Sequence, residues 1–401
     1  MAMKTQPGLS HRGLTVPASP IRRLVPYADR AKAAGAKIYH LNIGQPDIPT
    51  PREMIHAYQA FTAEVLAYGP SQGIPEFRRA VSTYWKGWQV DLPPEQVIAT
   101  TGGSEAILFA LLALCDPGDE ILIPEPFYTN YLGFAAVAAV NVVPVPASVA
   151  DGFRLPASAE FARRITPRTR AILFSNPGNP TGAVYTAAEL RRLGDLAGEH
   201  GLFLLADEVY REFVYDGARF TNAFSLTDVA DRVIVLDSVS KRYSACGARV
   251  GYLATRNEAV LDAALRLGQA RLCPPTVDQL AAAAAYTAPP SYLEAVRVEY
   301  QARRDILYAA LSGIPGVMAF KPAGAFYTVA KLPVADAEKF AIWLLTDFRQ
   351  DGKSVMVAPA NGFYATEGSG RDEVRIAYVL KGEDLKAAMA ILAAALKAYP
   401  G

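Results

Sequence analysis

The stretch Asp237-Ser-Val-Ser-Lys-Arg-Tyr-Ser-Ala-Cys-Gly-Ala-Arg-Val-Gly-Tyr252 links two apolar runs, 233–236 and 250–254. Runs of this kind are typical of buried strands in a parallel sheet. Lys241 is therefore expected in a short serine-rich turn between two buried strands, with Ser238 before it and Arg249 after it. Such a turn offers an amine for covalent chemistry, with hydroxyl and guanidinium donors for an anion. A solvated lysine at a strand end is the alternative interpretation.

Other short apolar segments share the character of these two runs. Together they predict strands near 97–100, 120–123, 142–145, 171–175, 202–206, 233–236 and 250–254. Most connections between them are long enough to hold a helix and to return the chain for a parallel strand. The sequence therefore predicts an α/β fold with a mostly parallel seven-stranded sheet. Further helices are expected over 21–36, 258–267 and 281–285 and from near 291.

The composition is that of an ordinary globular protein. The chain has 401 residues, of which 51% are hydrophobic and 20% are charged, so two domains are expected. A formal net charge of +1 gives no electrostatic reason to expect nucleic acid or an anionic membrane as a partner. Three cysteines and four histidines lack metal-ligand spacing, so no metal site is expected. Without a signal core or an apolar run of membrane-spanning length, the cytoplasm is the default location.

Polar motifs follow three of the other predicted strands. The two Asn-Pro steps of Asn176-Pro-Gly-Asn-Pro-Thr-Gly182 stiffen the loop that holds Asn179. Asp207 directly follows the predicted strand over 202–206. The string Gly102-Gly-Ser104 opens a helix with Ser104 as its expected N-cap, and a helix N-terminus is a ready anion site. Open α/β sheets bind ligands at the carboxyl ends of their strands, so these motifs predict one shared binding site.

These motifs resemble those of the class I/II aminotransferases, the fold-type-I enzymes of pyridoxal 5'-phosphate (PLP). The resemblance rests on Ser-x-Ser-Lys…Gly-x-Arg-x-Gly-Tyr around Lys241 and on Asn-Pro-x-Asn-Pro-Thr-Gly around Asn179, and it extends over about residues 20–395. It implies a three-layer PLP-transferase fold similar to that of aspartate aminotransferase, with a smaller α+β domain beside the large one. It also implies PLP as the cofactor and Lys241 as its Schiff-base lysine.

The resemblance assigns further residues to the cofactor. Asp207 would keep the pyridine nitrogen protonated, and Asn179 and Tyr210 would donate to the phenolic oxygen. Tyr128 is the residue expected to stack on the ring, with Phe127 as the neighbouring alternative. The contacts expected at the phosphate are Gly102, Gly103, Ser104, Ser238, Arg249 and, from the neighbouring subunit, Tyr68. A Tyr68 that crosses between subunits implies a homodimer with shared active sites.

Contacts with the substrate follow from the same resemblance. The backbone at Gly44 lies against the substrate, and Arg375 grips its α-carboxylate beside Asn179. In dicarboxylate-using members an arginine in the region of Arg271 reaches the partner's active site and binds the distal carboxylate, so aspartate or glutamate is the favoured donor. Alternatively, Arg271 pairs with an acidic side chain at the domain junction. Aromatic donors are the other alternative, in a pocket lined by Tyr128, Tyr131 and Tyr327.

The predicted activity is PLP-dependent transamination between an L-amino acid and a 2-oxo acid, with Lys241, Asp207 and Tyr210 as catalytic residues. An aromatic or broad-specificity aminotransferase and a PLP-dependent lyase acting at the β- or γ-carbon share these motifs and stay open. A cofactor-binding regulator fused to DNA-binding helices is disfavoured by the short N-terminal arm and the near-neutral charge. The predicted division is an arm over residues 1–20, a small domain over 21–47 and 290–401, and a large PLP-binding domain over 48–289.

Overall fold

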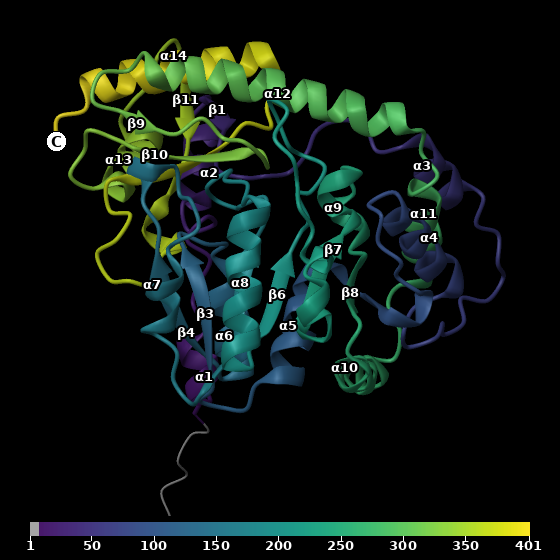
Figure 1. The fold of residues 1–401 in the computed structure, drawn as a ribbon. Helices are drawn as coiled ribbons and strands as arrows, with labels where there is room; N and C mark the ends of the chain where they lie inside the picture. Colours follow the sequence, from purple (N-terminus) through teal and green to yellow (C-terminus); the bar gives the residue numbers. More distant parts are fainter. Residues whose placement is uncertain (1–7) are drawn as a thin grey trace, which may run out of the picture.

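The computed structural model of the protein describes residues 8–401. Its largest feature is a seven-stranded sheet with the strand order β2-β8-β7-β6-β5-β3-β4 (Figure 1). These strands are β2 (Val97–Thr100), β3 (Glu120–Glu125), β4 (Asn141–Pro146), β5 (Thr169–Ser175), β6 (Phe203–Asp207), β7 (Val233–Ser238) and β8 (Gly251–Thr255). Neighbouring strands are parallel except where β8 pairs with β2 and β7. The predicted strands and the mostly parallel sheet are confirmed.

Helices fill most of the connections. They are α1 (His11–Thr15), α2 (Val25–Ala33), α3 (Arg52–Gln59), α4 (Pro75–Lys86), α5 (Gly102–Leu114), α6 (Asn130–Ala138), α7 (Ser158–Ala162), α8 (Ala187–His200), α9 (Val239–Arg242), α10 (Glu258–Arg271), α11 (Thr276–Ala285), α12 (Pro290–Ser312), α13 (Ala337–Thr346) and α14 (Gly382–Ala398). The short helix α9, which carries Lys241, stands where the sequence predicts a turn. Its four residues rise only about 6 Å, too little to carry the chain back along a six-residue strand, so β8 runs antiparallel to β7.

The two faces of the large sheet are separated by the alternation of side chains along each strand. In β7, Val233 and Val235 point into one hydrophobic core, whereas Ile234 and Leu236 point into another. Helices α4, α8 and α11 contribute to the first core, and α5, α6 and α10 contribute to the second. Both faces are therefore covered, which explains why the strands are continuous apolar runs in the sequence. The result is the predicted three-layer arrangement (Figure 1).

A further core lies beside the large sheet and is built from both ends of the described chain. It contains an antiparallel sheet in the order β12-β13-β10-β9 and the parallel pair β1-β11. These strands are β1 (Lys37–His40), β9 (Met318–Ala319), β10 (Tyr327–Lys331), β11 (Lys353–Met356), β12 (Ala358–Pro359) and β13 (Glu373–Ala377). The long helices α12 and α14 lie side by side along its outer side (Figure 1). This separate core supports our proposal that both chain ends form a small domain.

The N-terminal segment differs from the sequence prediction in two places. Residues 11–15 of the predicted arm form α1, and residues 1–7 lie outside the described residues. The helix expected over 21–36 begins only at Val25, because Pro26 lacks an N–H and fits the first turn of a helix. The residues before it form turns, in which the N–H groups of Arg22 and Arg23 donate to the Ser19 carbonyl. Arg22 therefore lies in a turn ahead of α2.

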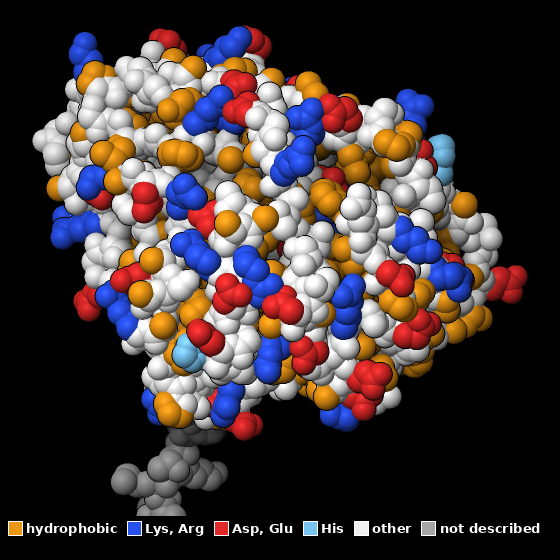
Figure 2. Space-filling view, in the orientation of Figure 1, with side chains coloured by type: hydrophobic (Ala, Val, Ile, Leu, Met, Phe, Trp, Pro, Cys, Tyr) orange, Lys and Arg blue, Asp and Glu red, His pale blue; other side chains and the backbone are white. Residues whose placement is uncertain are grey.

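Basic and acidic side chains are interspersed over the face shown in Figure 2, and no large area of one sign is visible there. This distribution agrees with the formal net charge of +1. Within residues 8–401, no helix has both the length and the apolar character needed to cross a membrane. The cytoplasmic location stays a prediction.

Candidate active site

The carboxyl ends of three neighbouring strands open onto one cavity of about 710 Å³. Asn179 follows β5, Asp207 ends β6 and Lys241 follows β7, and all three residues line this cavity. Residues of the small domain, among them Arg375, complete the wall. The volume lies in the range of small-molecule sites, and the position is the one at which open α/β sheets bind ligands.

Lys241 projects from α9 toward the small domain. Its Nζ donates to the Gly44 carbonyl oxygen at 2.9 Å and lies 3.7 Å from the Cys246 Sγ. A Cβ on Gly44 would lie 1.7 Å from the Tyr327 hydroxyl, so only glycine fits at this position. Ser238 caps α9 by accepting the Ser240 N–H at 3.3 Å, and this cap fixes the helix that carries the amine.

Asp207 is buried at the end of β6, where its carboxylate accepts a hydrogen bond from the Tyr131 hydroxyl at 2.6 Å. Burial raises the pKa of Asp207 to about 6, although the hydrogen bond from Tyr131 opposes that shift. A carboxylate so placed favours a nearby positive charge, because a bound cation would offset part of the free energy lost on burial.

The N-terminus of α5 and the Arg249 guanidinium form the anion-binding part of the site. A Cβ on Gly102 would lie 2.6 Å from the Arg249 Nη2, and Gly102 has a φ of +71°, so both space and backbone require glycine. Within residues 8–401, Arg249 forms no ion pair with a carboxylate, and its Nη1 donates to the Cys246 carbonyl oxygen at 3.2 Å. Its charge and the free N–H groups of α5 are therefore free to meet an anion.

Ser104 is not the N-cap of α5, so that prediction is wrong. The helix begins at Gly102 with Thr101 as its N-cap. The Glu105 carboxylate accepts the Thr101 N–H at 2.8 Å and so supplies a side-chain acceptor at this end of the helix. Ser104 lies in the first turn and lines the cavity together with Gly103 and Ser238.

Arg375 lies in β13 and is only 2% exposed. Its Nη1 donates to the Asn179 Oδ1 at 3.1 Å, and its Nη2 donates to the Asn42 carbonyl oxygen at 2.6 Å. Its Nε has no hydrogen-bond partner among the described residues. A buried donor without a partner costs free energy, so this guanidinium is prepared for an acceptor that a ligand brings into the cavity.

Aromatic side chains complete the wall. Tyr128 lines the cavity, whereas Phe127 is 3% exposed and packs into the core against Tyr131. Of the two rings that the sequence leaves open, Tyr128 is therefore the one that a ligand can reach. The hydroxyls of Tyr210 and Tyr327 lie 3.1 Å apart, and both residues line the cavity.

Three predicted site residues, Gly102, Tyr68 and Arg271, are not among those that line the cavity. Gly102 nevertheless lies against the Arg249 guanidinium. Tyr68 is 82% exposed. The Arg271 Nη1 donates to Glu105 at 2.9 Å, and its Nη2 donates to the Ser71 carbonyl oxygen at 3.0 Å. This geometry supports the alternative in which Arg271 pairs with an acidic side chain, and contacts of Tyr68 or Arg271 with a partner's site stay predictions.

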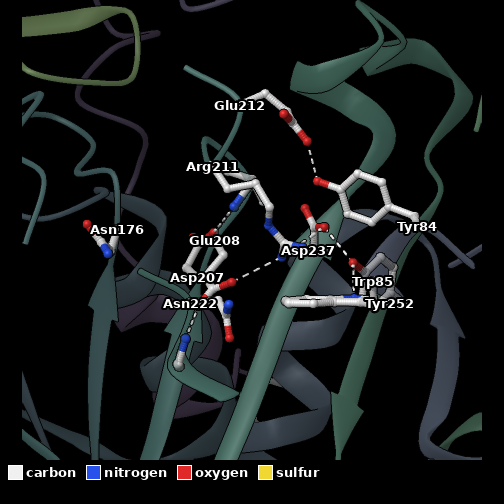
Figure 3. A network of polar contacts seen from close by, with 12 residues as sticks. Tyr84, Trp85, Asn176, Asp207, Glu208, Arg211, Glu212, Asn222, Asp237 and Tyr252 are labelled. Carbon is white, nitrogen blue, oxygen red and sulfur yellow. Dashed lines mark hydrogen bonds and ion pairs between the residues drawn. The ribbon is translucent and has the colours of Figure 1, made fainter. Parts of the chain in front are cut away.

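A second buried carboxylate, Asp237, lies at the end of β7 and has a different environment from Asp207 (Figure 3). Its Oδ2 lies 2.9 Å from Arg242, 3.2 Å from Arg211 and 2.6 Å from the Tyr252 hydroxyl. Burial alone would raise the pKa of Asp237, but the two arginines outweigh it and hold that pKa below its ordinary value. Because Arg242 follows Lys241 and Arg211 follows Tyr210, Asp237 ties together the two segments that carry these site residues.

Sequence reasoning does not place Tyr131, Cys246 and Arg22 in their observed roles. Tyr131 is expected in an aromatic pocket, but it is fully buried and bonds Asp207 across 76 positions of sequence. Cys246 and Arg22 both line the cavity. The short spacing between Cys246 and Lys241 could have indicated that the two side chains lie close together. The position of Arg22 depends on where α2 begins, at Val25, which leaves Arg22 in the preceding turn.

Comparisons with known proteins identify the family. The family model described as "Aminotransferase class I and II" matches residues 36–392. The chain belongs to this family. It is 30% identical to an aspartate aminotransferase of Geobacillus stearothermophilus over 90% of this chain and 92% of that one. It is 34% identical to aromatic-amino-acid aminotransferase 2 of Thermococcus litoralis over 95% of this chain and 96% of that one.

Solved aminotransferases share the fold. The aspartate aminotransferase of Thermus thermophilus, solved with maleate, superposes with a TM-score of 0.88 at 30% identity, over 97% of this chain and 100% of that one. The alanine aminotransferase of Pyrococcus furiosus gives a TM-score of 0.89 at 34% identity, over 98% and 100% of the two chains. The predicted fold and family are therefore confirmed, and the cofactor of this aminotransferase family is PLP.

The donors in the cavity fit this cofactor. Its phosphate carries the negative charge that the α5 N-terminus and the unpaired Arg249 favour. Its pyridine nitrogen is basic, and Asp207 is a buried carboxylate that is stabilised by a neighbouring positive charge. Its aldehyde requires an amine, and the Lys241 Nζ lies in the same cavity. These groups meet the chemical requirements of the aminotransferase cofactor.

Proposed function

We propose that this class I/II aminotransferase takes an acidic L-amino acid, aspartate or glutamate, as its donor and a 2-oxo acid as its acceptor. The observation that carries this proposal is the charge of the cavity wall. Among residues 8–401, four cationic residues line it, Arg22, Lys241, Arg249 and Arg375, against the single carboxylate of Asp207. The aspartate aminotransferases among the relatives support the proposal, as does the maleate, a dicarboxylate, in the Thermus thermophilus structure. The aromatic aminotransferase of Thermococcus litoralis supports the alternative of an aromatic donor.

The residues of the site have distinct tasks in this proposal. PLP, when bound, withdraws electrons from the substrate Cα. Asp207 holds a proton at the pyridine nitrogen, while Asn179 and Tyr210 donate to the phenolic oxygen. The Arg375 guanidinium binds the α-carboxylate and so orients the Cα–H bond. The Lys241 Nζ then removes the proton from Cα as the general base.

Donor profiling tests this function. The enzyme loaded with PLP would be assayed with individual L-amino acids and 2-oxoglutarate or oxaloacetate, with the product oxo acid and free ammonia measured in parallel. We expect oxo acid without ammonia, and the largest kcat/KM for aspartate or glutamate. Release of ammonia would instead indicate a lyase, and a preference for phenylalanine would favour the aromatic alternative. Binding of PLP without turnover of any donor would favour the alternative of a non-enzymatic, cofactor-binding regulator.

The hydrogen bond from Tyr131 is expected to set the acid limb of the pH–rate profile. Activity in the proposed mechanism needs an ionised Asp207, so it falls as the pH falls through the pKa of this carboxyl in the PLP-loaded enzyme. That pKa lies below the value of about 6 that burial produces without the cofactor, because the charge of the protonated pyridine favours the carboxylate. Tyr131→Phe removes a donor that lowers this pKa. The acid limb of kcat/KM should therefore move to higher pH, by roughly one unit. An acid limb at the same pH in the variant would show that another group sets it.

We also propose that the enzyme is a homodimer in which Tyr68 contacts the cofactor phosphate of the neighbouring subunit. The 82% exposure of this tyrosine and its place outside its own cavity support the proposal. Val65 and Leu66, which are 77% and 66% exposed, extend the same surface. Large exposed apolar side chains close together are typical of an interaction surface.

Mixing two inactive or weakened chains tests the role of Tyr68. Tyr68→Phe alone should weaken PLP binding by roughly tenfold, because a hydrogen bond to a charged group is lost. A heterodimer of Tyr68→Phe and Lys241→Ala chains has one site with both Lys241 and Tyr68 intact, provided that Tyr68 acts across the interface. At a PLP concentration near the parental Kd, which leaves the Tyr68→Phe sites mostly empty, activity of the mixture should therefore exceed that of either parent. A mixture no more active than the Tyr68→Phe parent would place Tyr68 within its own subunit's site or outside both.

A further inference from the structure

The cavity holds one cation more than the cofactor and the α-carboxylate require. Of its four cationic residues, Lys241 is the covalent amine, Arg249 faces the phosphate and Arg375 serves the α-carboxylate in the proposed function. Asp207, the one acidic residue of the wall in the described part of the chain, serves the pyridine nitrogen in the same proposal. Arg22 is left without a binding partner in this assignment. A positive side chain in the cavity wall that neither the cofactor nor the α-carboxylate uses favours a ligand with an additional anionic group.

The Arg22 guanidinium is free among the described residues. Its side chain is exposed and has no ion pair or hydrogen bond with any side chain of residues 8–401. Arg23 next to it is different, because its Nη2 donates to Glu338 at 2.6 Å and to Asn361 at 3.0 Å. One of two adjacent arginines therefore anchors the segment, whereas the other reaches the cavity unpaired.

The turn that carries Arg22 is fixed on the small domain. A Cβ on Gly362 would lie 2.4 Å from the Pro20 Cβ, so Pro20 packs directly on the backbone there. Leu24 is 1% exposed and belongs to the core of the small domain. With Pro20, Arg23 and Leu24 held, the backbone of Arg22 is positioned before any ligand arrives, which lowers the entropy cost of binding through its side chain.

Arg271, the sequence-based candidate for this task, is already engaged. Its guanidinium pairs with Glu105 at 2.9 Å and donates to the Ser71 carbonyl oxygen at 3.0 Å. Using it for a substrate would leave Glu105 without its partner and would break these contacts. Arg22 needs no such exchange.

We propose that Arg22 binds the distal carboxylate of the substrate and thereby determines the preference for acidic donors. The proposal rests on the proposed function, since it names the residue that recognises the side chain of an acidic amino acid. The guanidinium can donate two parallel hydrogen bonds to a carboxylate, the contact that the proposed function assigns to Arg375 for the α-carboxylate at another part of the wall. Arg22 is thus a specificity-determining residue that touches substrate but takes no part in proton transfer.

Equilibrium binding separates the distal carboxylate from the α-carboxylate. Succinate and butyrate have the same chain length, and only succinate carries a second carboxylate. Both would be titrated calorimetrically into the PLP-loaded enzyme and into its Arg22→Leu, Arg22→Lys and Arg30→Leu variants. We expect Arg22→Leu to raise the Kd of succinate by roughly 10- to 100-fold and to leave that of butyrate unchanged. Arg22→Lys should recover part of the loss. Arg30→Leu, which removes an exposed arginine of α2 that does not line the cavity, should bind both ligands as the parent does.

Steady-state kinetics give the second readout. Arg22→Leu should lower kcat/KM for aspartate by a similar factor and spare alanine and phenylalanine, whereas Arg271→Leu should leave the ratio of these donors unchanged. Equal losses for all donors, or a selective loss in Arg271→Leu instead, would overturn the role of Arg22. A parent enzyme that prefers a non-acidic donor would refute the proposed function. A parent that prefers aspartate while Arg22→Leu keeps that preference would refute only the role of Arg22.

Discussion

Replacing Lys241 by alanine is expected to remove nearly all transaminase turnover, with a loss of at least about 10⁴-fold. Lys241 is the one lysine among the described residues that line the cavity, and it combines two tasks in the proposed function. Its Nζ attaches the cofactor and later moves the proton at Cα, so no neighbouring side chain can replace both contributions. The Cys246 thiol, 3.7 Å away, is not an amine and cannot form the same linkage.

The measurement combines spectra, rates and chemical labelling. The parent enzyme with PLP should show the visible absorption of a lysine-bound cofactor, and Lys241→Ala should lack it. Lys331→Ala is the matched control, since Lys331 is exposed and pairs with Asp372 at 3.0 Å away from the cavity lining. Borohydride reduction followed by peptide mapping should label Lys241. Label on another lysine would disprove the assignment.

The sequence predicts the parts of this protein that depend on local pattern. Strands buried on both faces are continuous apolar runs, as Ile234 and Val235 illustrate by pointing into opposite cores. The proline-stiffened loop around Asn179 and the glycine pair at Gly102 are also recognisable from a few neighbouring residues. Both follow the end of a strand, as the sequence predicts. These features need no knowledge of distant contacts.

Contacts between distant segments are not predictable in the same way. The hydroxyl of Tyr131 meets Asp207 only because β3 and β6 lie in one sheet, and nothing in the local pattern of Tyr131 separates this role from packing. Competing local interactions also decide helix ends. Glu105, not Ser104, accepts the backbone N–H at the start of α5, that of the N-cap residue Thr101, and Pro26 favours a start of α2 at Val25. Arg271 is taken up by Glu105, a pairing that its own surroundings in the sequence do not reveal.

Asp207 and Asp237 are buried carboxylates at the ends of adjacent strands, and their surroundings separate their tasks. Two arginines surround Asp237, so it stays ionised and its task is structural. Asp207 has no arginine partner among the described residues, and burial raises its pKa to about 6. Only Asp207 lines the cavity. The charge that would stabilise its ionised form is therefore left for a ligand to supply.

Asp207→Asn is consequently expected to retain PLP but to lose roughly 10²-fold or more in kcat. A neutral amide cannot hold the proton at the pyridine nitrogen, so the ring accepts less charge from Cα when the proton leaves. Asparagine and aspartate side chains have nearly the same shape, and the asparagine Oδ1 can still accept a hydrogen bond from the Tyr131 hydroxyl. The fold and the cavity should therefore be unchanged. Circular dichroism and thermal unfolding would verify that, and PLP content would be measured by absorbance after alkaline release.

Asp195→Asn provides the control for Asp207→Asn, because Asp195 is an exposed carboxylate on α8 that pairs with Arg191 at 2.9 Å. It should keep parental kcat with the same donor and acceptor. The loss in Asp207→Asn should also appear in single-turnover rates with a saturating donor, since the proposed defect lies in removal of the Cα proton by Lys241. Single-turnover rates equal to those of the parent would mean that a different group holds the pyridine proton, and the raised pKa of Asp207 would then reflect burial without a catalytic role.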